Sequence, residues 1–207
     1  MGFTGRQFSR PSGAAGRLVG GLMARGNRAF NIEVADRLGA LHGGARRIAE
    51  VGCGPGVGLA ALLRRFPEAE VLGIDLSPEM LAQSRSRNAA AVRSGRLALR
   101  RGGVEQLDTP VDLIVAVHVL YFWHQPVEVL SWLRRAVTEE GLVGLGYRCR
   151  QDMPPPARRG FPKEGHLLYE VDSQVRGLFA AAGFQTARSV RIDATRMHLG
   201  WLTVARP

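Results

Sequence analysis

The sequence has two cysteines, one lysine and no long apolar run. Cys53 and Cys149 stand in unlike contexts and suggest no disulfide framework, so a reducing cytoplasm is the expected location. No apolar run reaches the roughly 18–20 residues that a membrane span needs, and residues 1–6 lack the apolar core of a signal peptide. No zinc-ligand spacing is present, so no metal site is expected.

The basic charge is almost entirely arginine, because Lys163 is the only lysine in a chain of net charge +10. Such a balance can indicate nucleic-acid binding. The arginines are spread in pairs along the chain, however, which is typical of solvated charge on helices and at strand ends. The first 32 residues, with five arginines and no acid, either contact an anionic substrate or face water.

The most informative stretch is residues 48–58, which read IAEVGCGPGVG. A short apolar strand runs into a glycine-rich turn, a helix is predicted over residues 59–66, and a second apolar strand ends at Asp75. This order predicts a nucleotide-binding βαβ unit, in which a carboxylate at the second strand tip accepts ribose hydroxyls. A dinucleotide fingerprint is disfavoured because Val57 stands where its third glycine belongs.

The glycine spacing has the form acidic-x-Gly-x-Gly-x-Gly, carried by Glu50, Gly52, Gly54 and Gly56. The second strand is followed by Asp75-Leu76-Ser77-Pro78-Glu79-Met80-Leu81, where Ser77 and Pro78 suit a helix N-terminus. With these two motifs the chain resembles the class I S-adenosylmethionine-dependent methyltransferases. The leading residues also look like those of a group of small bacterial methyltransferases.

The resemblance implies that the chain binds S-adenosylmethionine and releases S-adenosylhomocysteine as product. It also implies which residues bind the donor. Glu50 is expected to hold the donor's ammonium, and Asp75 both ribose hydroxyls. The expected cofactor-binding residues are Glu50, Gly52, Cys53, Gly54, Gly56, Asp75, Leu76, Met80, Gly103, Val104, Glu105 and His118. Leu76 and Met80 are expected to flank the adenine, and Cys53 is a buried spacer.

One turn departs from the family's pattern. After the third strand the family often carries an acidic residue that meets the adenine amine, but this chain has Gly102-Gly103-Val104-Glu105. Adenine recognition then rests on backbone groups, or on Glu105 if the turn has shifted.

The rest of the chain alternates strands and helices. Further strands are predicted near residues 96–100 and at 111–117, 142–147, 185–192 and 198–205, with helices at 127–138 and 171–182. This pattern predicts an α/β fold, a doubly wound, mostly parallel seven-stranded sheet with helices on both faces. The resemblance implies that the last strand is antiparallel.

One compact domain is expected, divided into an N-terminal helical cap or lid over residues 1–44 and the methyltransferase domain over 45–207. Helix-like stretches fill residues 13–41. Residues 151–166 are rich in proline and glycine and form an irregular loop, which is either a substrate cap or a plain surface loop.

The tip of the fourth strand supplies the candidate catalytic residues, His118 and Tyr121. Methyl transfer from a sulfonium is an in-line displacement, so the protein chiefly aligns the reactants and adds a base where the acceptor carries a proton. His118 is the candidate base, or else lines the donor pocket. Tyr121 and Trp123 form either an aromatic wall beside a cation or ordinary core.

The predicted function is metal-independent methyl transfer to an O, N or C nucleophile of a small molecule. The sequence lacks an Asn/Asp-Pro-Pro-aromatic element after the fourth strand, a cysteine suited to cytosine methylation and clustered aspartates for a metal. The alternatives are an RNA- or protein-directed methyltransferase that uses the arginine-rich surface, and a protein that binds the donor without catalysis. A nicotinamide oxidoreductase is a fourth alternative, disfavoured by Val57.

Overall fold

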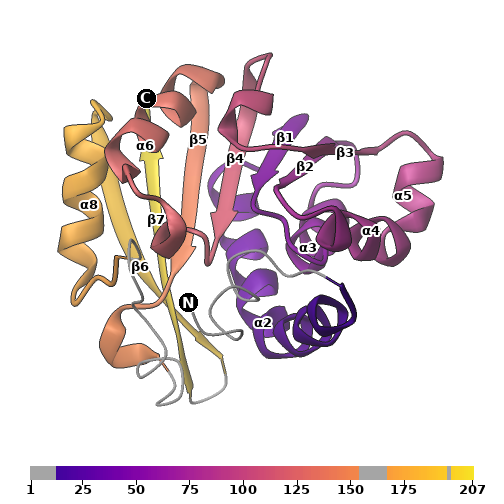
Figure 1. The fold of residues 1–207 in the computed structure, drawn as a ribbon. Helices are drawn as coiled ribbons and strands as arrows, with labels where there is room; N and C mark the ends of the chain where they lie inside the picture. The colour runs from indigo at the N-terminus through magenta and orange to yellow at the C-terminus, as the bar shows by residue number, and fades with distance from the viewer. Residues whose placement is uncertain (1–12, 154–166, 195–196) are drawn as a thin grey trace.

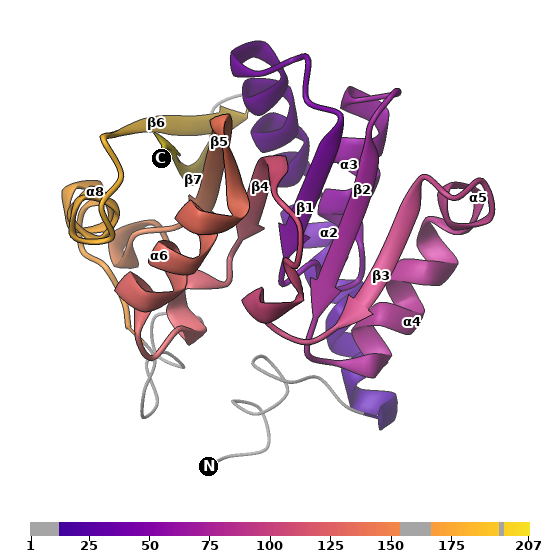
Figure 2. The same cartoon turned by 90° about the horizontal axis from the view of Figure 1, so that it is seen from above.

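The structure, a computed structural model, describes residues 13–153, 167–194 and 197–207. Within those ranges one seven-stranded sheet crosses the molecule, with helices on both faces (Figures 1 and 2). The strands are β1 (Arg47–Val51), β2 (Glu70–Asp75), β3 (Leu97–Arg101), β4 (Val111–Val117), β5 (Val137–Tyr147), β6 (Thr186–Ala194) and β7 (Met197–Arg206). The predicted α/β fold class is therefore confirmed.

The helices cover the two faces unequally. They are α2 (Gly13–Leu41), α3 (Val57–Arg65), α4 (Pro78–Arg87), α5 (Ala89–Arg93), α6 (Pro126–Ala136) and α8 (Asp172–Ala181), joined by the 3-10 turns η1 (Val104–Gln106), η2 (Leu120–Phe122) and η3 (Arg150–Asp152). Helices α2, α3, α4 and α5 lie together on one face, and α6 and α8 lie on the other, as Figure 2 shows from above.

The strand order is β3-β2-β1-β4-β5-β7-β6. Strands β1 to β5 are parallel, and β7 is antiparallel to both of its neighbours, as the resemblance implied. The chain order reverses between β1 and β4, because β1 pairs with β2 on one side and with β4 on the other. In open α/β sheets the crevice outside the carboxyl ends of such strands is where ligands bind.

Apolar side chains form one cluster on each face of the sheet. Leu130 and Leu133 of α6 are fully buried on one face of the sheet. On the other face, Phe30, Val34 and Leu38 of α2 are at most 1% exposed. The second half of α2 is therefore part of the core, since its side chains pack directly on the sheet.

Most predicted element bounds agree with the structure. The strand at 111–117 is observed as β4 (Val111–Val117), and the stretches at 13–41 form one continuous helix. The prediction for β5 was wrong at its start, because the strand begins at Val137 and α6 ends at Ala136. Val137 pairs with Val111, and the register then shifts so that Leu113 lies opposite Leu142. Residues 138–141 are therefore an irregular stretch within the strand.

Two of the expected features lie outside the described residues, namely the leading residues up to 12 and the proline-rich segment 154–166. Within the described ranges, no helix combines the length and the apolar character that crossing a bilayer requires.

Candidate functional site

The glycine-rich turn joins β1 to α3 at the point where the strand order reverses. Gly52, Gly54 and Gly56 all have a positive φ, between 51° and 79°, which only glycine adopts readily. The backbone N–H groups of Gly52 and Cys53 donate to the carbonyl of Ile74 on β2, at 2.8 and 3.0 Å. The turn is thereby fixed against the neighbouring strand, with its backbone facing the crevice.

Glu50 lies in β1 and directs a buried carboxylate toward the start of α3. The residue is 2% exposed, and its Oε2 is buried without a hydrogen-bond partner. Burial and the nearby charge of Asp75 raise the pKa of Glu50 to about 8, although the backbone N–H of Leu59 acts in the opposite direction. Without a cation beside it, Glu50 is therefore mostly protonated at neutral pH.

Gly58 brings three elements into contact around this carboxylate. A Cβ atom at residue 58 would overlap the carboxylate of Glu50 and would lie 2.8 Å from Oδ1 of Asn31 on α2. The Nδ2 of Asn31 donates to the carbonyl of Asn27 at 2.8 Å, which turns the amide oxygen toward the same region. The carboxylate and the amide oxygen thus form a small group of acceptors behind the turn.

Asp75 ends β2 and faces the glycine-rich turn. Its Oδ2 accepts from the backbone N–H of Gly54 and its Oδ1 from the backbone N–H of Ser77, both at 2.8 Å. Burial raises the pKa of Asp75, and these two N–H groups lower it. Each oxygen keeps a lone pair for a further donor, so the carboxylate can still accept two hydroxyl groups.

The turn after β3 is stabilised by its own acidic residue. The Oε1 of Glu105 accepts from the backbone N–H of Gly103 at 2.7 Å. A Cβ atom at Gly103 would lie 2.6 Å from the Oε2 of Glu105, so this carboxylate occupies the space of a side chain at 103. The bond from Gly103 is the main cause of the lowered pKa of Glu105, which keeps the group ionised.

His118 follows β4 in an unusual conformation. Its φ of 58° makes it the one non-glycine residue with a positive φ in the described part of the chain, and such strain is common at functional sites. Its ring stacks on Phe30 at 4.8 Å, and its Nε2 is buried without a partner. Burial, and then the charge of Arg148, lowers the pKa of His118 to about 3, so the imidazole is neutral at physiological pH.

The hydroxyl of Tyr121 hydrogen-bonds to the backbone of the residue after β5. It accepts from the backbone N–H of Arg148 at 2.5 Å and donates to the carbonyl of the same residue at 3.2 Å. The side chain is 5% exposed, and burial raises the pKa of its hydroxyl well above the usual value. These two hydrogen bonds connect Tyr121 to the segment after β5.

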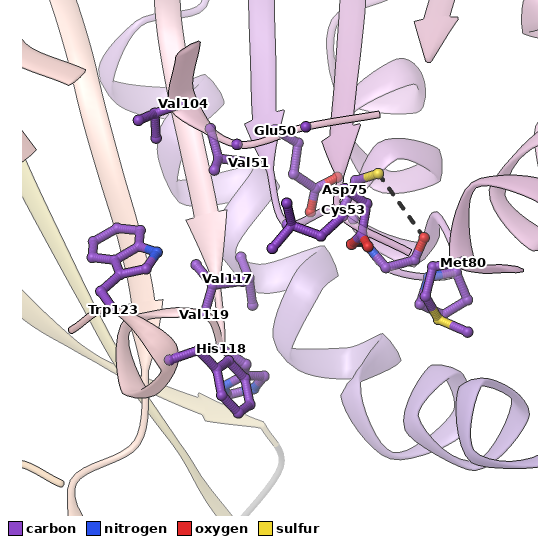
Figure 3. Close-up of a pocket in the computed structure, with 18 of the residues that line it drawn as sticks. Glu50, Val51, Cys53, Asp75, Met80, Val104, Val117, His118, Val119 and Trp123 are labelled. Carbon is purple, nitrogen blue, oxygen red and sulfur yellow. Dashed lines mark hydrogen bonds between the residues drawn. The ribbon is translucent and has the colours of Figure 1, made fainter. Parts of the chain in front are cut away.

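A cavity of about 340 Å³ lies at the carboxyl ends of β1, β2 and β4 (Figure 3). Figure 3 shows Met80 and Asp75 toward one end and Trp123 toward the other, with His118 below. Among the residues proposed from the sequence, those that line the cavity are Glu50, Gly52, Cys53, Gly54, Asp75, Leu76, Met80, Gly103, Val104, Glu105 and His118. Gly56 and Tyr121 are not in the lining.

Trp123, expected as a possible aromatic wall, also lines the cavity. Several lining residues were not predicted from the sequence, namely Asn27, Asn31, Val51, Pro55, Val57, Gly58, Gly102, Val117, Val119, Phe122 and Val129. Gly58 belongs to the glycine run and could have been found by extending that spacing by one step. The two asparagines carry no such signal, because α2 approaches the cavity only through the tertiary fold.

The polar lining is acidic on the donor side. Glu50, Asp75 and Glu105 contribute carboxyl groups, and no lysine or arginine among the described residues lines the cavity. This character suits a ligand with positive charge. No group of three or more His, Cys, Asp or Glu side chains within the described ranges could hold a metal ion.

Comparison with known proteins agrees with this geometry. A family model described as a methyltransferase domain matches residues 49–143. The chain is 30% identical to a trans-aconitate 2-methyltransferase of Methylobacterium nodulans over 164 residues, which are 77% of this chain and 56% of that protein. It is 26% identical to the uncharacterized methyltransferase YdaC of Bacillus subtilis over 172 residues, 81% of this chain and 86% of that one.

Among solved structures, the mitomycin 7-O-methyltransferase MmcR superposes on the whole chain with a TM-score of 0.76 at 18% identity, over 61% of its own length. DesVI of Streptomyces venezuelae superposes on 87% of the chain with a TM-score of 0.65 at 14% identity, over 92% of its own length. At identities this low, the two superpositions show a shared fold and no more. The chain spans just over half the length of the trans-aconitate relative.

The fold, the glycine-rich turn after β1 and the match to a methyltransferase domain together define the class of this protein. The chain belongs to the class I S-adenosylmethionine-dependent methyltransferases.

Proposed function

We propose that this chain transfers a methyl group from S-adenosylmethionine to a small molecule by in-line displacement, without a metal ion. The observation that carries the proposal is the pair of carboxyl groups of Glu50 and Asp75, which face one cavity from the ends of adjacent parallel strands. They are separated by the glycine-rich turn, so a ligand over that turn meets both.

The donor's ammonium fits the unpartnered oxygen of Glu50. A buried acid with one unsatisfied oxygen is costly unless a cation or donor reaches it. An ammonium beside Glu50 favours the ionised carboxylate and draws the pKa down from about 8. Asn31 adds a neutral amide oxygen next to this carboxylate, which supports an ammonium with a further acceptor.

The ribose and adenine have matching positions along the cavity. Asp75 is proposed to accept the two ribose hydroxyls through the oxygens that the backbone N–H groups of Gly54 and Ser77 hold in place. Leu76, which is 48% exposed, and Met80 are proposed to flank the adenine, together with Val104, which also lines the cavity. Glu105 is proposed to accept from the adenine amine, because its carboxylate occupies the space of a side chain at 103.

S-adenosylmethionine supplies a methyl group on a positively charged sulfur, which reacts with a nucleophile aligned behind it. The residues of this chain bind and orient the two molecules in an enclosed site. His118 is proposed to contact the acceptor as a neutral imidazole, since its lowered pKa makes it a weak base. Tyr121 is proposed to act only through the backbone of Arg148.

The N-terminal segment is proposed to cap the site. Asn27 and Asn31 of α2 line the cavity, and the helix continues from them toward residue 13. Among residues 27–44, Phe30, Val34, Ala35 and Leu38 belong to the core. We therefore propose that this part of the segment anchors the cap on the sheet, while Asn27 and Asn31 face the cavity.

Isothermal titration with S-adenosylhomocysteine, and with NAD in parallel, tests the proposal. We expect micromolar binding of the first and none of the second. Asp75→Asn should weaken the binding by about tenfold or more, because hydrogen bonds to a charged group are lost. Asp112→Asn is the matched control, since Asp112 also accepts from two backbone N–H groups, those of Arg46 and Arg47. These residues lie at the amino ends of β1 and β4, whereas the cavity lies at the carboxyl ends. Absence of binding to the folded protein contradicts the proposal, as does equal binding of NAD.

A further inference from the structure

Helix α4 is connected at its start to the donor side of the cavity. The backbone N–H of Ser77, which precedes the helix, donates to Oδ1 of Asp75 at 2.8 Å, and the Ser77 hydroxyl accepts from the backbone N–H of Met80 at 3.2 Å. Asp75 and Met80 both line the cavity. The start of α4 therefore fixes the carboxylate that we assign to the ribose.

The other end of α4 contacts the glycine-rich turn from behind. Asn88, which follows the helix, donates through Nδ2 to the carbonyl of Gly56 at 3.0 Å and to that of Ser84 at 3.1 Å. The Nε of Arg87 donates to the carbonyl of Pro55 at 2.8 Å. Both N–H groups of the Asn88 amide are thus engaged, and the residue is only 7% exposed. We call Arg87 and Asn88 the α4 clamp.

The clamp packs tightly on Gly56. A Cβ atom at this residue would lie 2.5 Å from Oγ of Ser84 and 2.6 Å from Nδ2 of Asn88. The φ of Gly56 is 79°, and a glycine run in such conformations loses much backbone freedom on folding. Hydrogen bonds from outside the turn are therefore needed to hold it in one conformation.

The two halves of the turn are held by different partners. In the first half, backbone N–H groups donate to β2 and to its last residue, Asp75. In the second half, the carbonyls of Pro55 and Gly56 accept from the α4 clamp. One helix of ten residues thus holds Asp75 at its start and the turn at its end. An α-helix of this size is a stiff connection about 15 Å long.

The α4 clamp acts from outside the cavity. Within the described part of the chain, Pro55 and Gly58 line the cavity and the clamp does not. Its side chains therefore act on a ligand only through the backbone of the turn. A shift of the Gly56 carbonyl moves the start of α3, where a Cβ atom at Gly58 would overlap the carboxylate of Glu50. The clamp thus fixes the part of the cavity that we assign to the donor's ammonium.

We propose that the α4 clamp positions the second half of the glycine-rich turn for the amino-acid end of S-adenosylmethionine, and that Asn88 contributes most of this effect. The inference rests on the proposed function and adds two positioning residues to it. Asn88 contributes more than Arg87 because its amide is buried, whereas water replaces the hydrogen bond of the exposed Arg87 when that bond is lost.

The test titrates the full chain with S-adenosylhomocysteine and with 5′-methylthioadenosine, which keeps the adenine, ribose and sulfur but lacks the amino-acid end. Asn88→Leu has a side chain of similar shape without an N–H, so it leaves the buried carbonyl of Gly56 without its donor. We expect it to weaken the binding of S-adenosylhomocysteine by about tenfold. The binding of 5′-methylthioadenosine should weaken by less than about threefold.

Arg87 gives a second, milder variant. Arg87→Met removes the donor to Pro55 and should weaken the binding of S-adenosylhomocysteine by about threefold. Arg87→Lys keeps a donor at this position and should restore most of the affinity.

Arg96→Met is the matched control for a loss of stability. The guanidinium of Arg96 also donates to backbone carbonyls, but those carbonyls belong to Leu63, Phe66 and Ala69, at and beyond the end of α3 that lies away from the turn. This variant should unfold at a lower temperature and bind both ligands like the wild type. A merely structural role of the clamp would give the same result for Asn88→Leu.

The outcomes separate this inference from the proposed function. If the wild type does not bind S-adenosylhomocysteine, the proposed function itself fails. If it does bind, three results overturn the inference alone: Asn88→Leu binds S-adenosylhomocysteine like the wild type, it loses affinity for both ligands equally, or Arg96→Met loses as much affinity. If Asn88→Leu does not fold, Arg87→Met takes its place, and unchanged affinity or an equal loss for both ligands overturns the inference.

Discussion

The carboxylate of Glu50 lies where a side chain on Gly58 would begin. The strand that carries the acid and the helix that carries the glycine are joined by the glycine-rich turn, so the turn fixes how closely they approach. The last glycine of the run thus leaves room for the charged group that we assign to the donor's ammonium.

Replacing Gly58 tests this relationship. Gly58→Ala should displace the carboxylate of Glu50 and weaken the binding of S-adenosylhomocysteine by about tenfold or more, since the methyl group meets both Glu50 and Asn31. Gly177→Ala in α8 is the control, because a Cβ there meets nothing within 4 Å. That variant should gain roughly 0.5–1 kcal/mol of stability and bind normally. Titration calorimetry and thermal unfolding measure both effects, and unchanged affinity in Gly58→Ala would count against the assignment.

The buried acid predicts a pH dependence of stability. The pKa of Glu50 is raised to about 8 in the folded chain, above its value of 4.5 when unfolded. The protonated acid therefore contributes stability that is fully present below pH 4.5 and is lost as the pH rises through about 8. Glu50→Gln cannot ionise, so the ligand-free variant should be more stable than the wild type at pH 8, by on the order of 4 kcal/mol.

Chemical denaturation at several pH values checks this expectation. The difference between Glu50→Gln and the wild type should shrink toward pH 5, while the variant loses affinity for S-adenosylhomocysteine. Glu128→Gln on the exposed start of α6 serves as the control. A stability difference that does not change with pH would show that Glu50 is not the titrating group.

Glu105 predicts selectivity for the nucleobase. The wild type should prefer S-adenosylhomocysteine over its inosine analogue, which has a carbonyl oxygen in place of the adenine amine, by about tenfold. Glu105→Gln should narrow this preference, because an amide can both donate and accept. Competition titrations with the two ligands measure the ratio. If the ratio of the two affinities is the same in Glu105→Gln as in the wild type, Glu105 does not recognise the adenine amine.

Tyr121 and Tyr169 allow a hydroxyl that is hydrogen-bonded to the backbone to be compared with a buried hydroxyl that has no partner. Tyr121→Phe removes the partner of the backbone N–H of Arg148 and should cost about 1–3 kcal/mol of stability. It should lower kcat with little change in donor affinity. Tyr169→Phe is the counterpart, because the hydroxyl of Tyr169 is buried without a partner, and its loss should be neutral or stabilising. Equal effects of the two variants in thermal unfolding would refute the role of Tyr121.

The fold and the donor side of the site could be predicted because their signals are local. Glu50, the glycines and Asp75 lie within one βαβ unit, and parallel pairing of β1 with β2 brings their ends together. The start of β5 could not be predicted, because Val137 is extended only through pairing with Val111 on another strand.

Other parts of the site and its surroundings depend on contacts between distant parts of the chain. Asn31 reaches the cavity from α2, and Arg148 is held by Tyr121 and Leu199, 27 and 51 residues away. The left-handed conformation of His118 has no sequence signal, since glycine or asparagine is the usual residue there. Its lowered pKa follows from burial that only the folded chain creates.

A crystal structure of the chain with S-adenosylhomocysteine tests the central claim most directly. The account predicts the ammonium within hydrogen-bond distance of Glu50, both ribose hydroxyls on Asp75 and the adenine between Leu76 and Val104. A ligand bound outside this cavity, or one whose ribose makes no contact with Asp75, would contradict it.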